Sequence, residues 1–126
     1  MTDAVNSGVT IAVVEDDPGL RTALEQLLRS AGFNAVTFES AEDFLVHLDS
    51  ADVDCLIADI NLPGASGADL VRALASRDPR LPAILMTGRH DDATVALARQ
   101  AGNVPRLYKP FSDSALFEVI ERVMRE

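Results

Sequence analysis

The chain has 126 residues, of which 48% are hydrophobic, 25% charged and 5% aromatic, a composition typical of one globular domain and not of a disordered segment. Its 20 acidic residues outnumber its 11 basic ones, and the net charge of −9 disfavours direct binding to nucleic acid, whose phosphates are also negative. No apolar stretch approaches the roughly 18 residues that span a membrane, and residues 1–7 lack the basic and apolar parts of a signal peptide. The single cysteine, Cys55, cannot form an internal disulfide, so we expect a small core residue in a protein of the reducing cytoplasm.

Short apolar runs of strand length recur along the chain. They lie at Val9–Val14, Ala35–Phe38, Val53–Ala58, Ala83–Met86 and Val104–Tyr108. The runs at Val9–Val14 and Ala83–Met86 are nearly unbroken, as expected of parallel strands whose two faces are both covered. Ala35–Phe38 alternates more and suits an edge strand.

Apolar residues with helical spacing follow each run. Before the first such stretch, Asp17 is the expected N-cap and Pro18 the first helical residue, and Gly32 lies beyond the end of the helix. The stretches that follow begin after a capping pattern at Ser40–Asp43, after Gly67, after Asp91–Asp92 and after a Ser112 cap. The stripe of the second includes Phe44, Leu45 and Leu48.

Strand and helix thus alternate five times, which predicts an α/β fold, a doubly wound parallel sheet with helices on both faces. We expect residues 1–8 to be an N-terminal tail and residues 9–126 to form one domain, because no linker or repeat interrupts this span. In such sheets ligands bind beyond the carboxyl ends of the strands.

Acidic, hydroxyl and basic residues stand at those strand ends: Glu15, Asp16 and Asp17 after the first, Asp59 at the third, Thr87 at the fourth and Lys109 at the fifth. If the first and third strands are neighbours, at least three carboxylates converge, and a divalent cation such as Mg²⁺ would relieve their repulsion. Thr87 and Lys109 at the same edge could hold an anion beside that metal. Together these groups predict a phosphoryl-transfer site.

Four motifs resemble the receiver domain of two-component response regulators in order and spacing: VVEDDPGLR (13–21), DINLPGASG (59–67), MTG (86–88) and KPF (109–111). The resemblance runs from about Thr10 to Met124, and the segments at Thr87–Gly88 and Ser40–Phe44 are similar to the FixJ/NarL-type subgroup, which is usually attached to helix-turn-helix output domains. The resemblance implies a flavodoxin-like (βα)5 fold with strand order 2-1-3-4-5. It also implies that the Lys109–Pro110 peptide is often cis.

By the same resemblance, Asp59 is the phosphoacceptor, and Thr87 and Lys109 contact phosphoryl oxygens. The implied Mg²⁺ ligands are the carboxylates of Glu15, Asp16 and Asp59 and the backbone carbonyl of Asn61. The implied phosphoryl donor is a sensor histidine kinase or a histidine phosphotransfer protein. The domain would catalyse only its own phosphorylation and dephosphorylation. A homodimer could form through its fourth helix, fifth strand and fifth helix, and the sequence leaves the oligomeric state open.

Arg106 departs from the family pattern, because most members have Tyr or Phe three residues before the lysine. A guanidinium cannot be buried as a ring can, so we expect Arg106 to stay near water or to pair with Asp91 or Asp92. Phosphorylation is still expected, but the usual route of signal transmission, through an aromatic side chain at this position, is in question.

Three other functions fit less well. A phosphatase of the haloacid dehalogenase type also has an aspartate nucleophile, but it needs an acid two residues further on, where this chain has Asn61. A nucleotide-binding domain needs a glycine-rich first turn, and this turn is acidic. A pseudo-receiver that acts by protein contact without phosphorylation is the alternative, and the complete set of acidic, threonine and lysine residues argues against it.

Overall fold

The computed structural model describes residues 8–47 and 53–125 of the chain. Strands and helices alternate in the order β1 (Thr10–Val14), α2 (Pro18–Ser30), β2 (Asn34–Phe38), α3 (Ala41–His47), β3 (Cys55–Asp59), α4 (Gly67–Arg77), β4 (Ala83–Thr87), α5 (Asp92–Gln100), β5 (Arg106–Tyr108) and α6 (Asp113–Arg125). The five strands are parallel and form one sheet in the order β2-β1-β3-β4-β5. The predicted fold class and strand order are confirmed.

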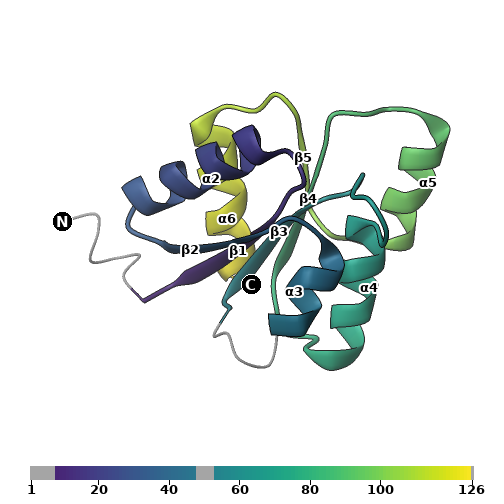
Figure 1. Cartoon of the computed structure of the whole chain (residues 1–126), viewed down its shortest axis with the longest axis horizontal. Coiled ribbons are helices and arrows are strands. Elements are labelled where there is room, and N and C mark those ends of the chain that lie inside the picture. Colours follow the sequence, from purple (N-terminus) through teal and green to yellow (C-terminus); the bar gives the residue numbers. More distant parts are fainter. Residues whose placement is uncertain (1–7, 48–52, 126) are drawn as a thin grey trace.

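Helices cover both faces of the sheet (Figure 1), and each face has its own apolar cluster. On one face, Leu24 and Leu28 of α2 pack with Leu116 and Ile120 of α6. On the other face the buried helix residues come from α3, α4 and α5, among them Phe44, Leu70, Leu74 and Ala98. Each fully buried large aliphatic side chain stabilises the fold by about 1.5–3 kcal/mol.

The central strands are buried along almost their whole length, and the edge strands are not. Every residue of β3 is buried, including Cys55, whereas β2 and β5 at the two edges have exposed positions. Burial raises the pKa of the Cys55 thiol to about 12, so the side chain stays protonated and behaves as a small core residue, as expected.

The predicted helix starts are confirmed by their hydrogen bonds. The Asp17 carboxylate accepts the Gly19 N–H at 2.9 Å, and Pro18 opens α2. The side chains of Ser40, Asp91 and Ser112 accept backbone N–H groups three residues further on in the same way. The capping box of α4, formed by Ser66 and Asp69, was not predicted.

Two predicted strands begin two residues later than expected. The strand predicted from Val53 begins at Cys55, because the Asp54 carboxylate accepts the Thr10 N–H at 2.8 Å in place of a backbone carbonyl. The strand predicted from Val104 begins at Arg106, because Pro105 has no N–H to donate. Leu48 and residues 1–7 of the expected tail lie outside the described residues.

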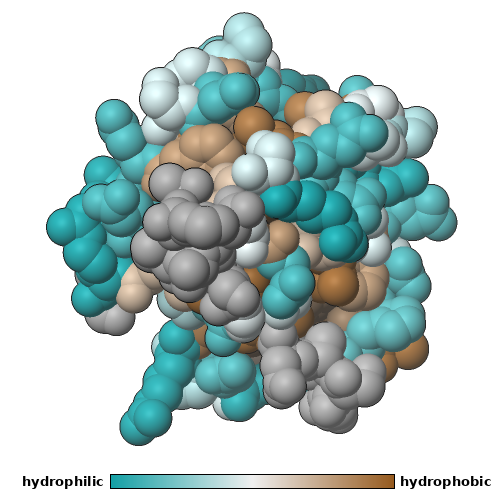
Figure 2. Space-filling view, turned by 90° about the vertical axis from the view of Figure 1, so that its left-hand side faces the viewer, coloured by the Kyte–Doolittle hydropathy of each residue, from teal (hydrophilic) through white to brown (hydrophobic). Residues whose placement is uncertain are grey.

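The molecular face on the left-hand side of Figure 1 is covered mainly by hydrophilic residues, with apolar side chains showing between them (Figure 2). Within residues 8–47 and 53–125, no helix has both the length and the apolar character needed to cross a membrane.

Candidate functional site

The residues singled out at the strand ends meet at the carboxyl edge of the sheet. Glu15 follows β1, Asp59 ends β3, Thr87 ends β4 and Lys109 follows β5. β1 and β3 are hydrogen-bonded neighbours, as the predicted convergence of carboxylates requires. The Lys109–Pro110 peptide is cis, as expected.

Three carboxylates form an acidic cluster, made of Glu15, Asp16 and Asp59, with ligand oxygens within 4.8 Å of one another. Glu15 is 1% exposed and Asp59 6% exposed, whereas Asp16 is exposed. Two unit charges 4.8 Å apart repel by about 3 kcal/mol at an effective dielectric constant near 20, so a cation beside them would be strongly favoured. Carboxylate oxygens are the ligands that hard divalent cations prefer, so the cluster fits Mg²⁺.

Lys109 supplies a positive charge to this cluster. Its Nζ donates to Glu15 Oε1 at 2.8 Å and to Asp59 Oδ2 at 2.6 Å. Burial acts to lower the pKa of Lys109, but the hydrogen bonds to Asp59 and Glu15 outweigh it and the pKa is raised. Burial raises the pKa of Glu15, and the hydrogen bonds from Lys109 and from the Asp17 N–H offset only part of that effect.

The backbone around the acidic cluster is held by two contacts that the sequence analysis did not identify. Arg21 Nη1, from the first turns of α2, donates to the carbonyl oxygen of Glu15 at 2.9 Å. Gly67 opens α4 so close to β3 that a Cβ atom there would lie 2.3 Å from the Asp59 carbonyl oxygen. A basic residue in the first helix and a glycine ending the DINLPGASG motif were visible signals, but neither is specific enough to assign a role from sequence.

Asn61 is connected to Asp59 and also to the start of α5. Its backbone N–H donates to Asp59 Oδ1 at 2.9 Å, and its side-chain Nδ2 donates to Thr94 Oγ1 at 3.1 Å. The Thr87 hydroxyl oxygen lies 3.1 Å from the Arg89 carbonyl oxygen and 3.4 Å from Asn61 Oδ1, and it accepts the Arg89 N–H at 3.0 Å. Thr87 is therefore at the expected strand end, with its hydroxyl bonded to the loop that follows β4.

The expected pairing of Arg106 with Asp91 or Asp92 was wrong, whereas the expectation that its side chain stays near water is not contradicted, because Arg106 is partly exposed. Arg106 Nη2 donates to the Ala98 carbonyl oxygen of α5 at 2.8 Å, and its Nε is buried with no hydrogen-bond partner among the described residues. Asp91, one of the two acids expected to pair with it, instead pairs with Arg89 at 2.8 Å. The nearer arginine on the same loop takes the acid, and Arg106 in the strand reaches a helix carbonyl instead.

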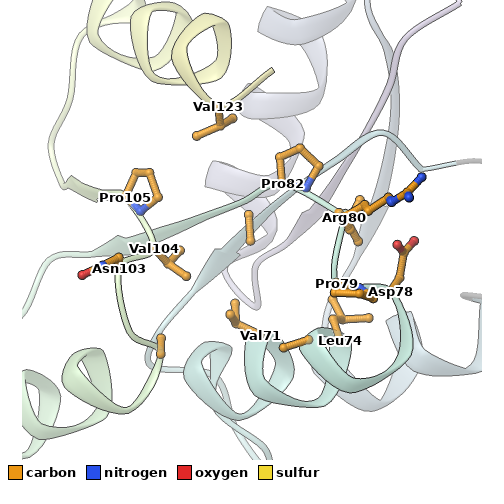
Figure 3. A pocket seen from close by; sticks show the side chains of 14 residues that line it. Val71, Leu74, Asp78, Pro79, Arg80, Pro82, Asn103, Val104, Pro105 and Val123 are labelled. Atoms are coloured by element: carbon orange, nitrogen blue, oxygen red, sulfur yellow. The ribbon is translucent and has the colours of Figure 1, made fainter. Parts of the chain in front are cut away.

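A cavity of about 560 Å³ lies at the opposite edge of the sheet, beneath the amino ends of β4 and β5 (Figure 3). Its lining is largely apolar, with Leu74, Pro82, Val104 and Val123 among the residues that face it. Glu15, Asp16 and Asp59 do not line this cavity, so it is separate from the candidate site.

The strand order and the groups at the carboxyl edge define a CheY-like α/β domain. The chain belongs to the response regulator receiver domain family, which it matches over residues 11–121. It is therefore a receiver domain of the two-component response regulator type.

Curated relatives and solved structures agree with this assignment. The transcriptional regulatory protein FixJ of Bradyrhizobium diazoefficiens is 34% identical over 116 residues, which are 92% of this chain and 57% of FixJ. The DNA-binding transcriptional regulator NtrC of Salmonella typhimurium is 37% identical over 112 residues, 89% of this chain and 24% of NtrC. The crystal structure of FixJ-N has a TM-score of 0.83 at 32% identity, covering 95% of this chain and 96% of that one. The resemblance to the FixJ/NarL type is confirmed, and the chain spans little more than half of FixJ and a quarter of NtrC.

Proposed function

We propose that Asp59 accepts a phosphoryl group from the phosphohistidine of a sensor histidine kinase or of a histidine phosphotransfer protein. The observation that carries this proposal is the setting of the Asp59 carboxylate. It is nearly buried, it is oriented by the Asn61 N–H and Lys109 Nζ, and it lies beside Glu15 and Asp16. A carboxylate fixed in this way is a suitable nucleophile.

In the transfer step, a carboxylate oxygen of Asp59 attacks the phosphorus atom of the donor phosphohistidine. The O–P bond forms, the P–N bond breaks, and the electron pair of that bond returns to the imidazole nitrogen. The signal ends by hydrolysis: water attacks the phosphorus atom and gives up a proton, the aspartyl O–P bond breaks with its electron pair returning to the carboxylate, and inorganic phosphate is released. The domain catalyses these two steps on itself and no other reaction.

The residues present fit Mg²⁺, which would be held by the carboxylates of Glu15, Asp16 and Asp59 and by the backbone carbonyl of Asn61. When bound, the ion supplies positive charge to the phosphoryl oxygens. Lys109 Nζ already lies 2.6 Å from Asp59 Oδ2, so it is placed to pair with a phosphoryl oxygen formed there. Thr87 binds another phosphoryl oxygen once its hydroxyl leaves the Arg89 carbonyl.

Phosphorylation then shifts the domain between two conformations and changes a surface used by a partner or an output domain. FixJ and NtrC are named as transcriptional regulators. This receiver domain would control the activity of a regulator of that kind, and would not bind nucleic acid itself. The other proposed partner is a second copy, through the face formed by α5, β5 and α6. A cytoplasmic location and the extent of the domain, residues 9–126 behind a tail of residues 1–8, stay predictions.

Intact-mass measurement after treatment with acetyl phosphate tests the proposal. The expected result is one phosphoryl adduct with Mg²⁺ and none with EDTA, because the acidic cluster repels phosphate unless a cation is bound. Asp59→Asn should abolish the adduct, and Asp43→Asn, which changes an exposed carboxylate of α3, should leave it intact.

An adduct that persists in Asp59→Asn would refute the assignment of the acceptor. A parent protein that forms no adduct with Mg²⁺, while Mg²⁺ and the fold are both verified, would favour the pseudo-receiver instead.

A further inference from the structure

Helix α5 is attached to the rest of the molecule differently from its neighbour α4. Its buried residues are Thr94 and Ala98, which are both small, whereas α4 buries Leu70, Val71 and Leu74. A cavity of about 230 Å³ lies between α5 and the adjoining strands, with Thr87, Thr94 and Arg106 in its lining. A helix that buries little apolar surface over a cavity can shift at small cost in packing.

Among the described residues, and apart from the helix's own N-cap, two side-chain hydrogen bonds reach α5, one from β5 and one from the loop that follows β3. Arg106 Nη2 reaches the Ala98 carbonyl at 2.8 Å, and Asn61 Nδ2 reaches Thr94 Oγ1 at 3.1 Å. The second bond begins at the residue whose own N–H holds Asp59 Oδ1. Asp59, Asn61 and Thr94 therefore form one continuous path from the acceptor to the first turn of α5.

The Asn61 amide also faces the hydroxyl of Thr87, whose oxygen is 3.4 Å from Asn61 Oδ1. A hydroxyl has one proton, so Thr87 cannot donate to a phosphoryl oxygen and at the same time to Asn61 or to the Arg89 carbonyl. Phosphorylation of Asp59 would therefore alter the surroundings of Asn61 on two sides, at the backbone N–H that faces Asp59 and at the amide oxygen that faces Thr87.

We infer that Asn61 is a positioning residue whose hydrogen bond to Thr94 holds α5 in the position that belongs to unphosphorylated Asp59. The bond weakens when Asp59 is loaded and Thr87 turns to the phosphoryl group, and the first turn of α5 is released. This inference rests on the proposed function, because it concerns regulation of the same site. By linkage, removing the bond must favour the loaded state by the same factor by which loading weakens the bond.

The test uses two variants that remove the Thr94 hydroxyl and two controls. Thr94→Val keeps the branched shape of the side chain, and Thr94→Ala introduces alanine, the best helix former. With two variants, the test does not depend on either one alone folding well. Thr94→Ser keeps the hydroxyl, and Thr22→Val makes the same exchange at an exposed position of α2. Binding of beryllofluoride with Mg²⁺, a phosphoryl mimic, is measured by calorimetry, and hydrogen exchange is followed at the Thr94 and Val95 amides.

Loss of one hydrogen bond should tighten beryllofluoride binding by about two- to tenfold in Thr94→Val and Thr94→Ala. Beryllofluoride should speed exchange of the two amides in the parent, while in these variants exchange is already fast and does not change. Thr94→Ser and Thr22→Val should behave as the parent does. If the parent binds beryllofluoride and both hydroxyl-deleted variants match it in affinity and in exchange, the inference is overturned and the proposed function stands. If the parent binds no beryllofluoride and forms no phosphoryl adduct, the proposed function fails and the inference falls with it.

Discussion

Replacing Lys109 by methionine should destabilise the fold through the two carboxylates that Lys109 now pairs. Lys109 Nζ lies 2.8 Å from Glu15 Oε1 and 2.6 Å from Asp59 Oδ2, and these two side chains are 1% and 8% exposed. Methionine retains the length of the apolar stem and removes the ammonium. The variant would therefore leave two buried negative charges facing each other.

The expected loss in free energy of unfolding is about 2–3 kcal/mol, at or below the lower end of the about 3–5 kcal/mol seen when one partner of a buried pair is removed. Two features reduce it. The Lys109 side chain is itself 23% exposed, and Glu15, whose pKa is already raised by burial, can take up a proton to relieve the repulsion. The folded-state pKa of Glu15 lies above the ordinary 4.5, so protonation of Glu15 favours the fold. The loss caused by Lys109→Met should therefore become smaller as the pH falls through that raised pKa toward 4.5.

Urea unfolding of the parent and of Lys109→Met, with and without Mg²⁺ and at several pH values, measures this loss. Mg²⁺ should reduce the deficit, because it brings positive charge to the same carboxylates. Arg72→Met is the matched control, since it removes an exposed ion pair with Asp69 that contributes at most about 1 kcal/mol. If Lys109→Met costs no more than Arg72→Met and shows no dependence on pH, the two carboxylates are not held together by Lys109.

Three further changes probe the surroundings of the site. Asp16→Asn removes one like charge from the acidic cluster, so the metal-free melting temperature should not fall while the rise on adding Mg²⁺ disappears; a lower metal-free value would contradict this. Gly67→Ala places a Cβ 2.3 Å from the Asp59 carbonyl oxygen and should cost at least about 1–3 kcal/mol in urea unfolding, whereas a neutral effect would show that α4 moves freely. The Ser66 N–H holds the pKa of Asp69 below its ordinary 3.8, so this carboxylate stabilises the fold above pH 3.8 and its contribution is lost as pH falls through the folded-state pKa. Asp69→Asn should make the free energy of unfolding depend less on pH in this acidic range. An NMR titration that gives Asp69 a pKa above 3.8 would be inconsistent with the hydrogen bond.

The fold could be predicted because its signals are local and agree with one another. The nearly unbroken apolar run before Glu15 becomes a strand buried on both faces. Asp17 caps the first helix by accepting backbone N–H groups, and Pro18 is its first residue. The ends of strands were less predictable. They depend on groups such as the Asp54 carboxylate, which takes the place of a backbone acceptor from a neighbouring strand.

The convergence of Glu15, Asp59 and Lys109 followed from their positions at strand ends, because a parallel sheet brings such positions to one edge. The partner of Arg106 could not be predicted in this way. It depends on how α5 lies across β5, and helix placement over a sheet edge is decided by tertiary packing rather than by local sequence. The bond between Asn61 and Thr94 depends on the same placement and was not predicted either.

The identity of the phosphoacceptor is tested most directly by reductive trapping. Borohydride reduces an aspartyl phosphate to homoserine, so the parent protein is treated with acetyl phosphate and Mg²⁺, reduced, digested and sequenced by mass spectrometry. The expected result is homoserine at position 59 alone, absent when EDTA replaces Mg²⁺. Homoserine at another acidic residue, or at none while an intact-mass adduct is present, would contradict the role of Asp59.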